Sequence, residues 1–429
     1  MRNHRRSRLR ITAILLALGL VLAACSSDSD SSDSPTPSTS GGPELTKSEI
    51  VLATPLSGFG LYPYTENAVK VWEQWANDNG GINGHPVRVV IVDTKDDPTV
   101  AQAEVRKVIA EDEPIAFVGG NEQTITSWFE QTVAANIPSV GGACFYATVI
   151  CSGPGASPLY FSATTTIPAI TQSSLVNAKQ NGATKFAGVV CAEVAACAAI
   201  EPVYAGTSEA LGMEYGGLIK ISSAAPDYNA ECLQLKGNDV DAVGLAVLED
   251  QAVKFVENCA AQGFFPQWQI TNGTVTDQVV TALADAAPDS RIAGGLDGPA
   301  WWIDDPQVVT VRDAFETYMP DADYQSDYTM TTWVAFELFR KAMANASENP
   351  TSEEVITAML ALQDEDLDGM LPQSMTYTAG EPAPFIQCFW MFEYKDGEMT
   401  LDPGPGPSGN SVSSGDLKSD CYPAPPTAS

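Results

Sequence analysis

Histidine is nearly absent from this chain, whose 429 residues include only His4 and His85. His4 lies in an arginine-rich leader, so His85 alone remains for the body of the protein. A Ser-His-Asp hydrolase or a histidine-ligated zinc enzyme would have to use His85, which stands in a tight Asn-Gly-His-Pro turn. Residues 206–210 (GTSEA) come nearest to a nucleophile elbow and do not match it. We therefore expect His85 to be a turn residue, and these two reaction classes are unsupported.

Phosphate-binding and dinucleotide-binding motifs are also missing. Gly58 and Gly60 begin such a pattern, but Pro63 stands where the dinucleotide fingerprint needs glycine or alanine. We therefore expect no cofactor. A secreted hydrolase that works with two carboxylates stays open, because acidic residues are abundant and no particular pair stands out.

Basic residues are scarce. Lysine and arginine number 22 against 54 aspartate and glutamate residues, which gives a formal net charge of −32 at pH 7. The first 24 residues contain five arginines and no acid, so the rest of the chain carries about −37 (−32 minus 5). Such a surface repels nucleic acid and anionic lipid headgroups, so a nucleic-acid partner is excluded.

Long apolar runs are confined to the start of the chain. Residues 1–24 join five arginines to the run ITAILLALGLVLAA, which has signal-peptide length and is too short to span a membrane. The run ends in Leu-Ala-Ala-Cys, which resembles the bacterial lipoprotein processing box, with Cys25 as the lipidated first residue of the mature chain. Residues 26–47 have almost nothing to bury. We therefore expect residues 25–47 to form a lipidated, disordered linker that anchors the body to the outer face of the cell membrane.

Apart from Cys25, the chain has eight cysteines and no CxxC pair. This pattern favours disulfides in an oxidising compartment, and no metal site is expected. Asp93, Asp96 and Asp97 lack EF-hand spacing, and helix capping explains them better than calcium binding does. Connectivity cannot be deduced from sequence alone, but proximity along the chain suggests four pairs: Cys144–Cys151, Cys191–Cys197, Cys232–Cys259 and Cys388–Cys421.

Strands and helices alternate along most of the chain, as residues 77–98 (NDNGGINGHPVRVVIVDTKDDP) show. Gly80 and Gly81 end a helix, Asn83-Gly84 turns the chain, residues 87–92 form a buried strand, and Asp97-Pro98 begins the next helix. Other strands are predicted at residues 50–53, 115–118, 139–141, 160–163, 186–190, 218–221, 242–247, 267–270 and 292–296. Helices are predicted near Tyr64, Thr99 and Gln123, and at residues 169–180, 198–211, 230–235, 250–261, 277–284, 306–319, 325–346 and 352–362. Antiparallel strands are predicted in the tail, at residues 374–378, 385–394 and 398–401.

The opening strand, the loop Pro55-Leu56-Ser57-Gly58, the helix ending in GGING and the acidic D-x-x-D-P crest resemble the type I periplasmic binding proteins, in the branched-chain amino-acid receptor group. The resemblance covers roughly residues 48–400. It implies an α/β fold of two doubly wound parallel-sheet lobes joined by three crossovers. Lobe 1 would comprise residues 48–164 and 297–373, and lobe 2 residues 165–296 and 374–425. Ligands bind at the carboxyl ends of strands in such sheets, so we expect a site between the lobes that closes by a hinge motion.

Candidate ligand-binding residues lie on loops that follow strands. In the first lobe they are Tyr62, Asn121, Gln123, Thr124, Ala143 and Phe145. In the second lobe they are Glu193, Glu249 and Asn272, with Trp301 at a crossover. Glu122 would repel a ligand carboxylate, and Asn272 stands near the position where amino-acid receptors of this family carry an acid for the ligand's ammonium group. Together with the aromatic residues, these departures favour a neutral or cationic solute with some apolar surface.

The resemblance thus implies an extracytoplasmic solute-binding lipoprotein of an ABC importer, with no catalytic act of its own. It would capture a small organic solute that is amino-acid-like, an amide or aromatic, and present it to permease subunits. A receptor that feeds a sensor kinase is the alternative with the same fold. A secreted carboxylate-based hydrolase is the alternative from another class.

Overall fold

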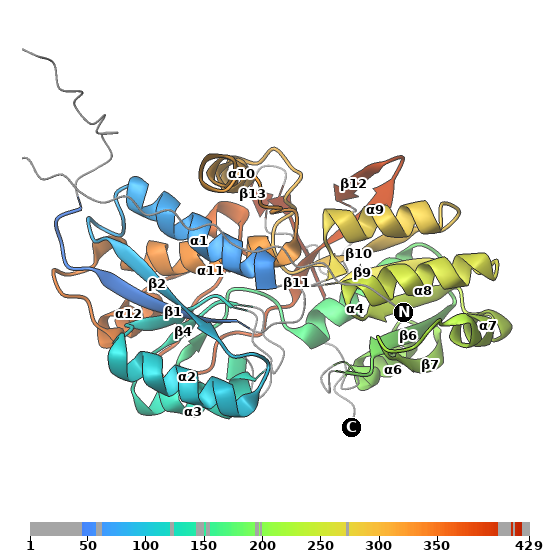
Figure 1. Ribbon diagram of the computed structural model, residues 1–429, viewed down its shortest axis with the longest axis horizontal. Coiled ribbons are helices and arrows are strands. Elements are labelled where there is room, and N and C mark those ends of the chain that lie inside the picture. Colours follow the sequence, from blue (N-terminus) through green and yellow to red (C-terminus); the bar gives the residue numbers. More distant parts are fainter. Residues whose placement is uncertain are drawn as a thin grey trace, which may run out of the picture. The chain divides into compact units, whose positions relative to one another are not determined.

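The protein folds into two α/β lobes, each built around a largely parallel sheet, as predicted (Figure 1). The computed structural model describes residues 45–56, 62–120, 124–142, 150–151, 155–193, 197, 200–271, 274–401, 413–414 and 417–422. We call the lobe with the five-stranded sheet the first lobe and the lobe with the larger sheet the second lobe.

The first lobe has a wholly parallel sheet with strand order β2-β1-β3-β4-β5. Its strands are β1 (Ile50–Leu56), β2 (Val87–Asp93), β3 (Ala116–Val118), β4 (Ser139–Val140) and β5 (Tyr160–Phe161). Its helices are α1 (Tyr62–Asp78), α2 (Pro98–Glu111), α3 (Ile125–Ala134), α10 (Pro306–Tyr318), α11 (Asp327–Ala342) and α12 (Ser352–Leu360), with the 3-10 turns η3 (Met343–Asn345) and η4 (Leu367–Gly369). Helices α1 and α11 cover one face of this sheet, while α2 and α3 cover the other (Figure 1).

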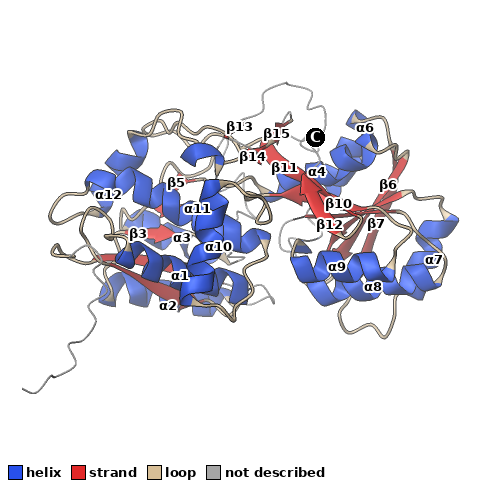
Figure 2. Cartoon of the chain, turned by 90° about the horizontal axis from the view of Figure 1, so that it is seen from above, coloured by secondary structure: helices blue, strands red, loops and turns tan. Residues whose placement is uncertain are grey.

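The second lobe has strand order β12-β11-β10-β9-β8-β6-β7, with β15 paired to β11. Its strands are β6 (Lys185–Cys191), β7 (Glu214–Ile221), β8 (Ala242–Ala246), β9 (Gln267–Thr271), β10 (Ile292–Leu296), β11 (Cys388–Lys395), β12 (Glu398–Leu401) and β15 (Asp420–Cys421). Its helices are α4 (Ile167–Gln180), α6 (Glu201–Ala210), α7 (Asn229–Gly237), α8 (Glu249–Ala261) and α9 (Asp277–Ala286). Helices α4 and α6 pack together on one face, and α7, α8 and α9 form a row on the other (Figure 2). A short hairpin of β13 (Ser413–Ser414) and β14 (Leu417–Lys418) stands apart from both sheets.

The turn into β2 shows why the sequence folds as it does. Asn83 and Gly84 both have positive φ, at 50° and 83°, which is the conformation a two-residue turn requires between Ile82 and His85. A Cβ atom on Gly81 would lie 1.9 Å from the His85 carbonyl oxygen, so only glycine fits there. His85 is fully buried in this turn, with its Nδ1 2.6 Å from the carbonyl oxygen of Ser48.

The acidic crest after β2 serves the next helix. Asp97 accepts hydrogen bonds from the N–H groups of Thr99 (2.7 Å) and Val100 (3.0 Å), and Pro98 occupies the first turn. These bonds from Val100 and Thr99 lower the pKa of the Asp97 carboxyl, because they stabilise its charged form. The predicted capping role of Asp97 is therefore confirmed.

The chain passes between the lobes three times, after β5, after β10 and after η4. The first and third passages are tied together. The Thr165 hydroxyl donates to the Ile386 carbonyl at 3.1 Å, and the Tyr377 hydroxyl donates to the Ser162 carbonyl at 2.6 Å. These bonds are buried, so the two passages are held as one unit.

Residues 374–378 do not form the predicted strand. Met375 makes only an isolated bridge to Glu365, although Met375 and Tyr377 are both buried in the main hydrophobic core. The alternation that predicted a strand therefore reflects burial of every second side chain. A strand does not form because no neighbouring strand extends the pairing beyond this one bridge. The other two tail strands are confirmed as β11 and β12, which pair antiparallel on the second lobe.

Three predicted disulfides are confirmed: Cys191–Cys197, Cys232–Cys259 and Cys388–Cys421. Cys151 is also disulfide-bonded, while Cys144 lies outside the described residues. The Cys388–Cys421 bridge joins β15 to β11 and so fastens the end of the chain to the second lobe. The predicted leader, Cys25 and most of the linker also lie outside the described residues.

Candidate functional site

Glu249, a predicted ligand-binding residue, lies beyond the carboxyl end of β8 in the second lobe. Glu249 is the first residue of α8, three residues beyond the end of β8. Its side chain is partly buried, and its Oε1 atom is fully buried without a hydrogen-bond partner among the described residues. Burial raises the pKa of the Glu249 carboxyl to about 7, with further contributions from the charges of Asp250 and Asp323. A carboxylate in this state is poised to receive a positively charged or hydrogen-bond-donating group.

Tyr64, on α1 of the first lobe, lies in the same region as Glu249. The Tyr64 hydroxyl donates to Oδ2 of Asp323 at 3.4 Å, and Thr276 of the second lobe lies near enough to act on the pKa of that hydroxyl. Burial raises the pKa of the Tyr64 hydroxyl, and the charges of Asp323 and Glu249 raise it further. Tyr64 of α1 therefore lies within electrostatic range of Glu249, so side chains of both lobes converge here.

Asp323 also contacts α9, a second helix of the second lobe. The Gln278 amide donates to Asp323 Oδ2 at 3.0 Å. Burial raises the pKa of Asp277, and the charge of Asp323 adds to that shift. Four carboxyl groups thus act on one another electrostatically in this region, with Asp323 acting on both Glu249 and Asp277, and Asp250 acting on Glu249. We call these four residues, with Tyr64, the acidic cluster.

Basic side chains near the acidic cluster have other partners. Lys254, on the same helix as Glu249, donates to the Ala225 carbonyl at 2.6 Å and lies over the Tyr228 ring. Arg312, whose charge acts on Tyr324, pairs with Asp304 at 2.8 Å. No ion pair within the described part of the chain neutralises a member of the acidic cluster.

Glu193, the candidate after β6, is bound to its own lobe. Its carboxylate accepts hydrogen bonds from the Ser222 hydroxyl (2.8 Å), from the N–H and hydroxyl of Ser223 (2.7 and 3.0 Å) and from the Gln251 amide (3.2 Å). Desolvation is the largest single influence and raises the pKa of Glu193, but the hydrogen bonds together outweigh it and lower that pKa to about 2. Glu193 is thus a charged anchor that joins the end of β6 to the start of α8, and its ligand role stays a prediction.

Trp301 packs inside the protein. It is 1% exposed and lies edge-on to Trp302, with ring centroids 4.9 Å apart, and Trp302 in turn contacts Phe392 of β11. These contacts anchor the passage that follows β10 against the second lobe. A ligand contact by Trp301 stays a prediction.

The first-lobe candidates are described only in part. Thr124 precedes α3 and is buried, at 6% exposed, without a capping hydrogen bond from its side chain. Tyr62 is the first residue of α1, but its side chain lies outside the described part of the structure. Five further candidates also lie outside it: Asn121, Gln123, Ala143, Phe145 and Asn272.

Sequence reasoning missed Tyr64, Thr276 and Asp323. Tyr62 was the predicted ligand-binding aromatic residue, whereas Tyr64, two positions later, was predicted only as the start of a helix. Asp323 lies between two helices, in a stretch without periodicity, and nothing local connects it with Tyr64, 259 positions away. Only the tertiary fold brings these residues together.

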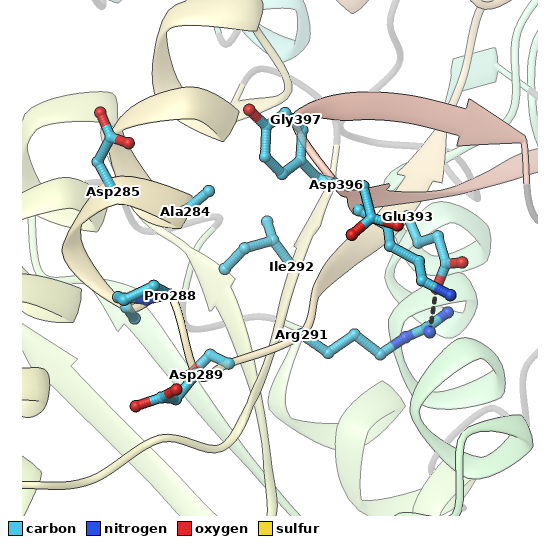
Figure 3. Close-up of a pocket in the computed structure, with 13 residues that line it drawn as sticks. Ala284, Asp285, Pro288, Asp289, Arg291, Ile292, Glu393, Asp396 and Gly397 are labelled. Atoms are coloured by element: carbon cyan, nitrogen blue, oxygen red, sulfur yellow. Dashed lines mark ion pairs between the residues drawn. The ribbon is translucent and has the colours of Figure 1, made fainter.

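A separate hollow of about 710 Å³ lies at the amino end of β10, where Ile292 forms part of its wall. The end of α9 borders it on one side and the β11–β12 hairpin on the other (Figure 3). An ion pair between Arg291, just before β10, and Glu393 of β11 forms part of its wall. Glu249 and Asp297 follow the carboxyl ends of β8 and β10. The acidic cluster is therefore at the carboxyl ends of the strands, whereas this hollow is at their amino ends.

Within the described residues, no group of three or more His, Cys, Asp or Glu side chains is arranged to hold a metal ion. No described helix is both long and apolar enough to cross a membrane.

Two parallel-sheet lobes, with polar side chains of one lobe reaching those of the other near strand ends, define a two-lobed receptor for small solutes. The family model described as "Periplasmic binding protein" matches residues 49–398. The chain therefore belongs to the periplasmic binding protein family, whose members are solute-binding receptors and not enzymes.

Solved structures share the fold at low sequence identity. A substrate-binding periplasmic protein from Ralstonia solanacearum matches with a TM-score of 0.67 and 18% identity, covering 82% of this chain and 100% of that one. A fatty acid ABC transporter substrate-binding protein from Thermomonospora curvata matches with a TM-score of 0.66 and 18% identity, covering 85% and 93%. A leucine binding protein from Thermotoga maritima matches with a TM-score of 0.66 and 12% identity, covering 82% and 97%. Comparison with curated proteins gives no significant match.

Proposed function

We propose that this protein is the lipid-anchored solute-binding component of an ABC importer. It captures a small organic solute between its two lobes, closes by rotation about the three passages, and presents the closed form to permease subunits. We further propose that lobe 1 comprises residues 48–164 and 297–373, and lobe 2 residues 165–296 and 374–425.

The observation that carries the proposal is the convergence of Tyr64 and Asp323 from the first lobe with Glu249 and Thr276 from the second. Groups that meet across two lobes are separated when the lobes rotate apart, so a solute placed among them couples binding to closure. Family membership supports capture as the mechanism. Two structural relatives bear the names of a fatty acid and of leucine, so solutes of different polarity occur on this fold.

Capture is tested with the intact protein and a thermal-shift panel of amino acids, amides, polyamines, sugars and aromatic acids. A solute at 100 times its Kd adds about 2.7 kcal/mol to the free energy of unfolding, which is readily seen as a higher Tm. A solute that raises Tm should also reduce the radius of gyration in solution scattering. If no solute of any class raises Tm, the capture function is wrong.

The anchor is tested separately. Expressed in a bacterial host, the protein should incorporate labelled fatty acid and sediment with membranes, because two acyl chains suffice for stable attachment. Cys25→Ser should abolish both the label and the sedimentation while leaving solute binding intact. Sedimentation of the Cys25→Ser variant with membranes would contradict a lipid anchor at that position.

A further inference from the structure

Glu249, in the acidic cluster, has a carboxylate oxygen without a hydrogen-bond donor among the described residues. Its Oε1 atom is buried, and no described residue donates a hydrogen bond to it. The groups that act on it are Asp250 on its own helix and Asp323 and Tyr64 from the first lobe, and none of them is basic. A buried carboxylate without a donor is unfavourable, so the structure leaves a place for a positively charged or donating group.

Closure of the lobes makes the unbalanced negative charge at the acidic cluster more unfavourable. Asp323 belongs to the segment between α10 and α11 of the first lobe, whereas Glu249 and Asp277 begin helices of the second lobe. When the lobes come together, like charges approach in a medium of lower dielectric constant, which costs free energy. A cation between them turns this repulsion into attraction. The solute itself can therefore supply the charge that makes the closed state favourable.

Among the residues that the structure describes, the basic side chains near the cluster already have partners. Lys254 is occupied by the Ala225 carbonyl and the Tyr228 ring, and Arg312 by Asp304. Moving either side chain to Glu249 would break an existing contact. At a pH where Glu249 is ionised, the described basic side chains near the cluster are thus engaged elsewhere, and a cationic solute can supply the positive charge.

We propose that the captured solute is an organic cation, an amine, guanidinium or quaternary ammonium compound, and that Glu249 is the residue that selects it. The inference rests on the proposed capture function. Tyr64 offers an aromatic ring beside the carboxylates, which suits the apolar part of such a solute or its charged end. A free carboxylate at this place would meet Glu249 and Asp323 as a like charge and is rejected.

The test compares solutes that share a carbon skeleton and differ in charge. Hexylammonium, hexanol and hexanoate form one series, and agmatine and choline extend the cations to guanidinium and quaternary ammonium. Calorimetry with the intact protein should show at least one cation that binds about tenfold or more tightly than its neutral counterpart, a difference of about 1.4 kcal/mol. The preference should weaken at high salt, because the cluster is partly open to solvent.

Glu249→Gln keeps the size of the side chain and removes its charge. This variant should lose the preference for the cation over its neutral counterpart, with about a tenfold loss of cation affinity. Glu257→Gln on the exposed face of the same helix is the matched control and should bind as the unmodified protein does. Circular dichroism and Tm confirm that both variants fold.

The outcomes separate this inference from the proposed function. If a neutral or anionic solute binds and compacts the protein while all cations fail, capture stands and cation selection is wrong. If cations bind equally well to Glu249→Gln, the role given to Glu249 is wrong. If no solute of any charge binds, the proposed function fails and this inference fails with it.

Discussion

The backbone N–H of Asp277, at the start of α9 in the second lobe, donates a hydrogen bond to the carbonyl oxygen of Gln325 in the first lobe at 3.0 Å. The return bond runs from the Asp327 N–H to the Val275 carbonyl at 3.1 Å. The two bonds make an antiparallel bridge between Thr276 and Ser326, which joins the lobes in addition to the three chain passages. The bridge lies beside the passage after β10, because the Asp327 carboxylate also accepts the N–H groups of that passage.

Asp277→Pro should remove one bond of this bridge without breaking α9. Proline is well tolerated at the first position of a helix, and the preceding Thr276 is extended (φ −128°, ψ 156°), as a residue before proline must be. We expect the free energy that holds the lobes together to fall by about 0.5–1.5 kcal/mol, the contribution of one hydrogen bond. The radius of gyration without solute should therefore be larger.

Asp277→Ala is the matched control, since it removes the carboxyl and retains the N–H group. Hydrogen exchange should be faster around residues 325–327 in Asp277→Pro than in Asp277→Ala. Equal exchange and equal radii of gyration in the two variants would show that the bridge does not hold the lobes together.

Asp327 is expected to stabilise the passage after β10. Its buried carboxyl accepts the N–H groups of Asp297 (3.2 Å) and Gly298 (2.9 Å). Asp327→Ala leaves both donors without this acceptor, so the free energy of unfolding should fall by about 2–4 kcal/mol. Asp327→Asn keeps one acceptor and should lose less, measured by urea denaturation.

The exposed Asp313 on α10 serves as the control for that measurement. Asp313→Ala should change stability by no more than about 0.5 kcal/mol. Asp327→Ala that unfolds at the same urea concentration as Asp313→Ala would contradict the role of Asp327.

The sequence predicted the sheets well because their signals are local. A β-branched run at residues 87–92, the glycines that end α1 and the Asp97-Pro98 cap each act within a few residues, and each is present in the structure. The predicted strand at residues 374–378 was wrong because alternation reports which side chains are buried and cannot report whether a partner strand lies alongside.

The candidate site was predicted less completely. Glu249 was found because it directly follows a strand, and such residues gather at one edge of a sheet. Tyr64, Thr276 and Asp323 depend on how three distant segments are packed together, and no spacing along the chain encodes that.

Stability should depend on pH in the direction set by the buried acids. Burial raises the pKa of Glu249 to about 7, and burial also raises the pKa of Asp327 well above its usual range, so the protonated forms of both are favoured in the folded state. Their contribution is fully present below their unfolded pKa values near 4 and is lost as pH rises through 7. Tm should therefore rise as pH is lowered from 8 to 5. Below that range, protonation of Glu193, with its pKa of about 2, begins to oppose the trend.

Glu249→Gln should remove part of this dependence. For a partly exposed group the effect is on the order of 1 kcal/mol between pH 5 and pH 8, after allowance for solvent screening. Differential scanning calorimetry at several pH values measures it, with Glu257→Gln as control. A Tm profile for Glu249→Gln that coincides with that of the unmodified protein would refute the buried character of this carboxyl.

Gly294 in β10 is expected to tolerate no side chain. An added Cβ would lie 1.7 Å from the carbonyl oxygen of Ile270 in the neighbouring strand, and backbone cannot move aside cheaply. Gly294→Ala should therefore lower the free energy of unfolding by more than about 3 kcal/mol or prevent folding. Gly237→Ala, at the end of α7 with nothing within 4 Å of its added Cβ, should be neutral or slightly stabilising. Similar urea midpoints for the two variants would contradict the close packing of β9 on β10.

Solution scattering of the intact protein, with and without the solute that raises Tm most, tests the capture of a solute between two moving lobes most directly. The account predicts a smaller radius of gyration at saturation, and a solute concentration for half of that change that matches the Kd from calorimetry. Tight binding of the solute with an unchanged radius of gyration would contradict it.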